Sequence, residues 1–127
     1  MLWNSTLEVG VPQIDTQHKE LFRQVDILMD VNNKTRIPET LKFLANYVVK
    51  HFNDEQVLQA VSKYPKAELH KSYHTKFIAT FNELKKEFDA SGPTLMVMMK
   101  INKTVIAWLK EHIMVHDKEF ANYYKSR

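Results

Sequence analysis

The sequence predicts an all-α protein, an up-down-up-down antiparallel four-helix bundle with an extended N-terminal arm. Its 127 residues include only two glycines, fewer than the turns of a β protein require. Four prolines, at positions 12, 38, 65 and 93, each stand where the first turn of a helix would tolerate proline. Between them, apolar residues recur at intervals of three and four, which is typical of amphipathic helices.

The four predicted helices follow the prolines in order, over residues 13–32, 38–63, 66–90 and 94–123. Each carries one inward-facing stripe. The apolar members of the stripes include Leu21 and Val25 in the first helix, Leu44 and Val48 in the second, Phe77 and Phe81 in the third, and Ile101 and Val105 in the fourth. The connections are short, so consecutive helices should be antiparallel neighbours. We expect a single domain over residues 1–127, made of an arm (1–12) and the bundle (13–123).

Composition excludes several classes of protein. The net charge of +3 comes from 18 basic and 15 acidic residues that are interspersed, so we expect neither nucleic-acid binding nor a membrane surface as partner. The absence of cysteine excludes disulfides, thiolate chemistry and iron–sulfur ligation. No apolar stretch approaches the ~18 residues of a membrane span, and the N-terminus lacks the pattern of a signal peptide. We expect a cytoplasmic protein.

Six polar residues interrupt the inward stripes. They are His18 in the first predicted helix, His51 and Glu55 in the second, His70 and His74 in the third, and His112 in the fourth. A buried carboxylate or unpaired imidazole is costly unless another group satisfies it. In an antiparallel bundle the start of one helix lies beside the end of the next, so all six should meet at one end. This convergence predicts a metal site.

The donor set favours a pair of first-row transition-metal ions. Five or six imidazoles exceed what one tetrahedral zinc ion needs, and calcium and magnesium prefer oxygen ligands. Imidazole suits iron, copper, nickel and zinc, and Glu55, one turn after His51, could bridge two ions. Spacing alone favours His116 over Asp117 as the companion of His112, because a residue five positions on lies about 140° around an α-helix.

Four motifs in this order resemble the hemerythrin family, and its single-domain bacterial members most closely. They are DTQH (15–18), HFNDE (51–55), HKSYH (70–74) and HIMVHD (112–117). The family pattern is a lone histidine followed by H-x-x-x-E, H-x-x-x-H and H-x-x-x-x-D, and every part of it is present. The chain departs from many bacterial relatives at Gln56, where they carry a second acid, but no ligand of the pattern is lost.

The resemblance implies two iron ions (Fe²⁺/Fe³⁺) bridged by an oxo or hydroxo group. The implied metal ligands are His70, His74 and His112 on one ion, His18 and His51 on the other, and Glu55 and Asp117 as bridges between them. The ion with two histidines would keep an open position. His116 is then expected to lie at the surface or behind the ligands.

The implied function is reversible binding of dioxygen, for its transport, storage, delivery or scavenging, with no catalytic residue. Two carboxylates among five neutral imidazoles carry less negative charge than the Glu-rich shells of di-iron enzymes of the bundle type, which favours binding over oxygenation. A di-iron peroxidase or oxidase that acts on O2, peroxide or nitric oxide with a redox partner is the alternative. An oxygen-sensing module is a third reading, disfavoured because the bundle leaves no output domain, and an O2-consuming enzyme is a further candidate partner.

An apolar, dry pocket should surround the bound dioxygen. The residues beside the ligands in sequence and on nearby faces are Phe52, Phe77, Trp108, Leu109 and Ile113. We expect them to form the wall of the O2 pocket, although core packing alone would also explain their apolar character.

Overall fold

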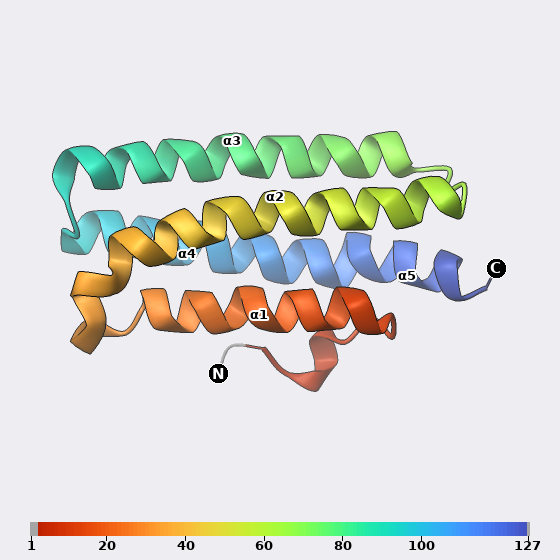
Figure 1. Cartoon of the computed structure of the whole chain (residues 1–127), viewed down its shortest axis with the longest axis horizontal. Helices are drawn as coiled ribbons and strands as arrows, with labels where there is room; N and C mark the ends of the chain where they lie inside the picture. The colour runs from red at the N-terminus through yellow and green to blue at the C-terminus, as the bar shows by residue number, and fades with distance from the viewer. Residues whose placement is uncertain (1–2, 127) are drawn as a thin grey trace.

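The computed structural model describes residues 3–126, and this part of the chain contains helices and no strand. Residues 1–2 of the predicted arm and residue 127 of the predicted domain lie outside the described residues. Four long helical segments lie side by side and alternate in direction along the chain (Figure 1). The predicted all-α, up-down-up-down bundle is confirmed.

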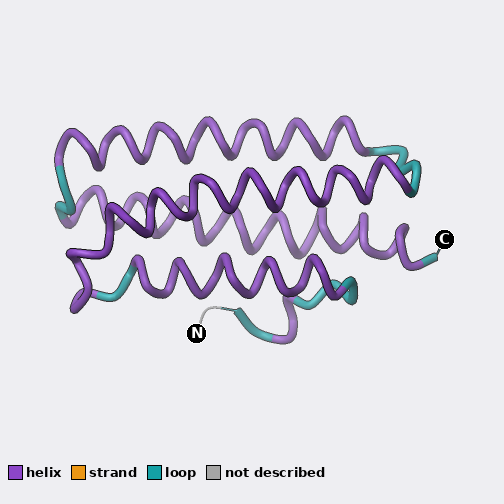
Figure 2. Tube along the Cα trace, in the orientation of Figure 1, coloured by secondary structure: helices purple, strands orange, loops and turns teal. Residues whose placement is uncertain are grey.

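Three of the four segments are single α-helices, and the fourth is composite. The single helices are α1 (Pro12–Leu28), α2 (Ile37–Val61) and α3 (Ala67–Ser91). The fourth segment is a continuous run of α4 (Leu95–Glu111), the π-helical segment η3 (His112–Asp117) and α5 (Lys118–Lys125). The loops that connect the four long segments lie at the ends of the bundle (Figure 2).

The ends of the helices differ from the prediction in two places. The first helix stops at Leu28, because the side chain of Asp30 accepts a hydrogen bond from the backbone N–H of Asn32 at 2.9 Å and starts a 3-10 segment, η2 (Val31–Arg36). Prolines 12 and 38 stand in the first turns of α1 and α2 as predicted, whereas prolines 65 and 93 precede the first residues of α3 and α4.

The N-terminal arm is fastened to the bundle at the start of α1 and at α5. It is extended except for a 3-10 turn, η1 (Ser5–Leu7). The backbone N–H groups of Val9 and Gly10 donate hydrogen bonds to the Asp15 carboxylate at 2.8 and 3.0 Å. Lys125 Nζ donates to the carbonyl of Val9 at 2.8 Å, which ties the arm to α5. Gly10 has φ +86°, a left-handed conformation that glycine adopts without steric cost.

The predicted stripes form one core along the bundle axis. Buried positions on them include Leu21, Val25, Leu44, Val48, Phe77, Phe81, Ile101 and Val105. None of the helices in the described part of the chain has the length and apolar character that crossing a membrane requires.

Candidate metal centre

Seven polar side chains are buried together at the end of the bundle where α1 and α3 begin and α2 ends. They are His18 of α1, His51 and Glu55 of α2, His70 and His74 of α3, and His112 and Asp117 of η3, and none is more than 4% exposed. The structure thus brings together every residue that the motifs nominated as a ligand.

Two of the motifs work through ordinary α-helical geometry. His51 and Glu55 lie four residues apart on α2, and His70 and His74 lie four apart on α3. Side chains at this spacing stand one above the other on a single face of an α-helix. Each pair therefore points into the bundle together.

The third pair, His112 and Asp117, depends on a different backbone. Segment η3 is π-helical, and the N–H of Lys118 donates to the carbonyl of Ile113, five residues earlier. The wider turn places residues five apart on one face, so Asp117 points inward and is 1% exposed. His116 instead lies half-buried, with its ring 4.2 Å from that of Tyr73. The spacing argument for His116 assumed an α-helix, which is absent between His112 and Asp117.

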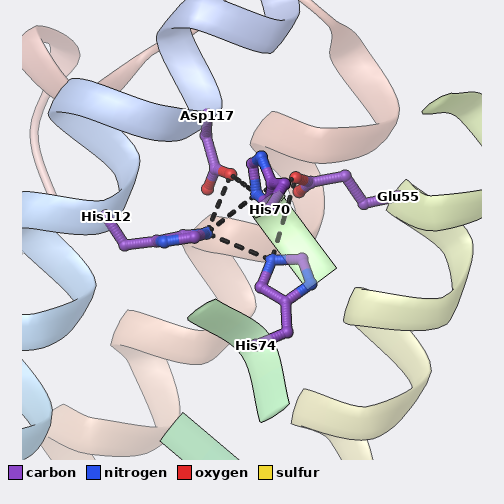
Figure 3. A group of neighbouring side chains, drawn as sticks. All are labelled: Glu55, His70, His74, His112 and Asp117. Atoms are coloured by element: carbon purple, nitrogen blue, oxygen red, sulfur yellow. Dashed lines mark hydrogen bonds and ion pairs between the residues drawn. The ribbon is translucent and has the colours of Figure 1, made fainter. Parts of the chain in front are cut away.

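One group of donors comprises Glu55, His70, His74, His112 and Asp117 (Figure 3). Nε2 of His112 lies 3.0 Å from Nε2 of His70 and 3.1 Å from Nε2 of His74. Oδ1 of Asp117 lies 3.0 Å from His70 Nε2 and 3.1 Å from His112 Nε2. Two atoms bonded to one metal ion at about 2.1 Å and at right angles are about 3.0 Å apart. These spacings fit neighbouring ligands of a single six-coordinate ion.

A second group, made of His18, His51, Glu55 and Asp117, shares both carboxylates with the first. Oδ2 of Asp117 lies 3.1 Å from His18 Nε2, and Oε2 of Glu55 lies 3.6 Å from His51 Nε2. The other oxygen of each carboxylate faces the first group, since Oε1 of Glu55 lies 2.8 Å from His70 Nε2. Each carboxylate therefore presents one oxygen to each group, as a bridge between two ions requires.

The hydrogen-bonding balance of the cluster also fits bound cations. Both ring nitrogens of His18, Oε2 of Glu55 and both oxygens of Asp117 are buried and make no hydrogen bond within the described residues. Such unsatisfied buried groups are rare in native proteins, because each costs the free energy of its lost hydration. Metal ions would satisfy the oxygens of Glu55 and Asp117 and the one lone pair that the imidazole of His18 offers.

The electrostatics of the cluster keep two imidazoles in the form that binds metal. Burial lowers the pKa of His51 to about 3, with the neighbouring His18 adding to the effect, and burial followed by His70 lowers the pKa of His74 to about 2. Burial and then the nearby Asp117 raise the pKa of Glu55 to about 8. Without metal, His51 and His74 are therefore neutral and the Glu55 carboxyl resists ionisation. His70 differs, because burial lowers its pKa but hydrogen bonds to Asp117 and Glu55 outweigh burial and raise it to about 9.

Three of the predicted pocket residues form an aromatic wall against the five-residue group. The ring of Phe52 stacks on His74 with centroids 3.7 Å apart, and Trp108 stacks on His112 at 4.3 Å and on Phe77 at 4.1 Å. Phe52 also reaches His51, at 5.7 Å.

The other two predicted pocket residues are aliphatic. Leu109 is 3% exposed and Ile113 is 1% exposed, so both belong to the buried interior. Their place in an O2 pocket stays a prediction.

Sequence reasoning assigned no contact with the cluster to Gln17 or Gln59. Gln17 Oε1 accepts a hydrogen bond from His51 Nδ1 at 2.7 Å, and the fully buried Gln59 approaches Glu55 Oε1 with its Nε2 at 3.4 Å. Gln59 lies one turn after Glu55 on the same stripe, so its spacing was a usable signal. Gln17 lies three residues after Ile14 and four before Leu21, so its spacing placed it on the buried face of its helix as well.

Comparison with known proteins identifies the family. Residues 9–124 match the family described as hemerythrin, the hemerythrin HHE cation binding domain. The chain belongs to the hemerythrin family. A bacteriohemerythrin of Methylococcus capsulatus (strain Bath) is 33% identical over 93% of this chain and 92% of its own length. A myohemerythrin of Theromyzon tessulatum is 28% identical over 93% of this chain and 88% of its own length.

A solved structure agrees with the sequence relatives. The crystal structure of wild-type hemerythrin superposes with a TM-score of 0.85 at 29% sequence identity, over 98% of this chain and 97% of that one. This hemerythrin thus shares the bundle of its relatives over nearly its whole length, and its cluster of histidines and carboxylates is suited to hold metal.

Proposed function

We propose that this hemerythrin is a non-haem di-iron protein that binds dioxygen reversibly. The observation that carries the proposal is the pair of donor groups joined by Glu55 and Asp117. One group offers three imidazoles and the other two, while both share the carboxylates. The ion between His18 and His51 would therefore have fewer protein ligands than its neighbour, and it is the ion at which an open position for dioxygen is expected.

Iron held by these residues would supply the redox chemistry, which is the reversible transfer of two electrons to dioxygen. The protein supplies position and charge. Five imidazoles and two carboxylates hold less negative charge than a Glu-rich shell, so the ligands of this chain would stabilise ferric iron less and favour the release of dioxygen. The names of the relatives, bacteriohemerythrin and myohemerythrin, support this assignment.

The buried surroundings of the cluster support reversible binding for a second reason. Water or protons that reach bound dioxygen would remove it in reduced form and leave ferric iron behind. We assign to Leu109 and Ile113, which are nearly inaccessible to solvent, the role of excluding water from the dioxygen position. Phe52 would seal the cluster between His51 and His74.

Metal analysis and gas titration test the proposal. The purified protein should contain two irons per chain, and the anaerobically reduced form should gain an absorption band in the near ultraviolet on exposure to air and lose it on degassing. A protein without iron would refute the proposal. Repeated turnover of O2 or peroxide with an added reductant, without reversal on degassing, would establish the enzymatic alternative instead.

A further inference from the structure

A chain of four polar side chains leads from the surface of α2 to the metal cluster. Lys50 Nζ and Gln17 Nε2 both donate to Oδ2 of Asp54, each at 2.8 Å. The other end of the Gln17 amide, Oε1, accepts from His51 Nδ1 at 2.7 Å in a buried contact. Gln17 is 7% exposed and His51 2%, whereas the side chain of Asp54 is 31% exposed. The chain thus connects solvent to one donor of the cluster.

The direction of each hydrogen bond in this chain is fixed by the chemistry of its groups. An ionised carboxylate can only accept hydrogen bonds, so Asp54 beside Lys50 must be met by the NH₂ end of the Gln17 amide. The carbonyl end then faces His51, and a carbonyl can only accept. His51 must therefore carry its proton on Nδ1, which leaves the lone pair of Nε2 free.

The free lone pair lies on the side of the ring that faces the cluster. His51 Nε2 is 3.6 Å from Oε2 of Glu55, within the second group of donors. A histidine ligand is commonly oriented by a hydrogen bond to its other nitrogen, and loss of such a partner typically weakens metal binding about 10- to 100-fold. The neighbouring His18 differs, because its Nδ1 has no partner among the described residues.

We propose that Gln17 is a positioning residue that holds His51 in its metal-binding tautomer, and that Asp54 sets the orientation of the Gln17 amide. The inference rests on the proposed function in so far as the site takes metal. It assigns to the surface pair of Lys50 and Asp54 a role at a cluster that neither side chain touches.

Two measurements on the full-length chain test this role without using dioxygen. In the metal-free protein, ¹⁵N NMR of the imidazoles reports which nitrogen of His51 carries the proton. Titration with zinc, in competition with a chelator, reports metal affinity. Gln17→Leu should give a mixture of His51 tautomers and about 10- to 100-fold weaker binding of the more weakly held zinc ion.

A matched control and a swapped pair separate positioning from packing. Gln24→Leu removes a second glutamine of α1, which is 9% exposed and donates to Glu20, and it should leave both readouts unchanged. Asp54→Asn alone allows the Gln17 amide to turn over and should mix the tautomers. Combined with Gln17→Glu, it exchanges the carboxylate and the amide. The hydrogen bond between positions 17 and 54 then runs in the opposite direction, but an acceptor still faces His51 Nδ1, so the wild-type tautomer should be recovered.

The outcomes decide the inference separately from the proposed function. Retention of the wild-type tautomer and zinc affinity in Gln17→Leu would overturn the inference, as would failure of the swapped pair to recover the tautomer. Absence of iron or of a reversible O2 response in the wild-type protein would overturn the proposed function, while the two readouts would still decide the role of Gln17.

Discussion

Removal of metal should destabilise this protein strongly, and the structure allows the size of the effect to be worked out. Five buried atoms of His18, Glu55 and Asp117 make no hydrogen bond within the described residues, and metal can satisfy four of them, because a neutral imidazole has only one lone pair. At the low end of the cost of an unsatisfied buried group, about 1 kcal/mol each, these four disfavour the metal-free fold by about 4 kcal/mol. Bound metal satisfies them and adds its binding free energy to the free energy of unfolding.

The corresponding shift in melting temperature is large enough to measure directly. An unfolding entropy of about 2.1 cal/mol/K per residue gives about 0.27 kcal/mol/K for the 127 residues. A difference of about 4 kcal/mol then corresponds to about 15 °C between the iron-loaded and metal-free forms. Differential scanning calorimetry before and after treatment with a chelator measures it. Equal melting temperatures would refute the reasoning that metal satisfies these atoms.

Glu55→Gln provides a matched control for this prediction. Because burial, then Asp117, raises the pKa of Glu55 to about 8, the carboxyl is mainly neutral at pH 7 in the metal-free protein, and a neutral amide of the same shape should change its melting temperature by less than about 4 °C. In the presence of iron the variant should lose at least one ion and most of the thermal gain, since an amide cannot bridge with two anionic oxygens. Equal destabilisation of both forms would show that Glu55 acts through packing alone.

Two further predictions concern η3 and the pocket. His116→Ala should keep two irons and the O2-dependent spectrum, whereas Asp117→Ala should lose the paired ions. Iron analysis and absorption spectra measure both effects, and the reverse result would mean that His116 is the ligand. Leu109→Ser should keep the iron but hasten decay of the O2-dependent band in stopped-flow measurements, because its hydroxyl recruits water. The control, Leu84→Ser, lies on the α3 stripe several turns from the cluster and should lower stability by roughly 2–4 kcal/mol without faster decay of the band. Equal decay rates for Leu109→Ser and wild type would show that Leu109 contributes only to core packing.

Most of the fold could be predicted from the sequence because local patterns and global packing agree. The stripes at spacings of three and four follow from α-helical geometry, and the buried Leu44, Phe81 and Ile101 bear them out. The end of α1 could not be placed, because an Asp30 side chain competes with the helix for the backbone of the next residues. Such short-range competition leaves little trace in hydrophobic periodicity.

The candidate site, like the fold, could be predicted from the sequence only in part. The pairs His51–Glu55 and His70–His74 follow from spacing, whereas Asp117 was nominated only through the resemblance to hemerythrins. Spacing selected the wrong neighbour as the inward-facing side chain because the π-helical turn of η3 has no periodicity of its own in the sequence. The hydrogen bonds of Gln17 could not be predicted from its place on the buried face of α1, since its partners lie on another helix.

The stacking of Trp108 on His112 gives this protein an optical property of its own. The chain has two tryptophans, and the indole of Trp108 lies nearly parallel to the imidazole of His112, with ring centroids 4.3 Å apart. If His112 binds an open-shell ion, an excited indole stacked on this histidine should transfer its energy or an electron to the ion before it emits light. Iron should therefore quench the intrinsic fluorescence of Trp108, while zinc, whose d shell is filled, should leave it bright. Trp3 of the arm packs against Lys19 of α1 and supplies a second emission that iron should affect less. The loading of the cluster can be followed in real time against this reference.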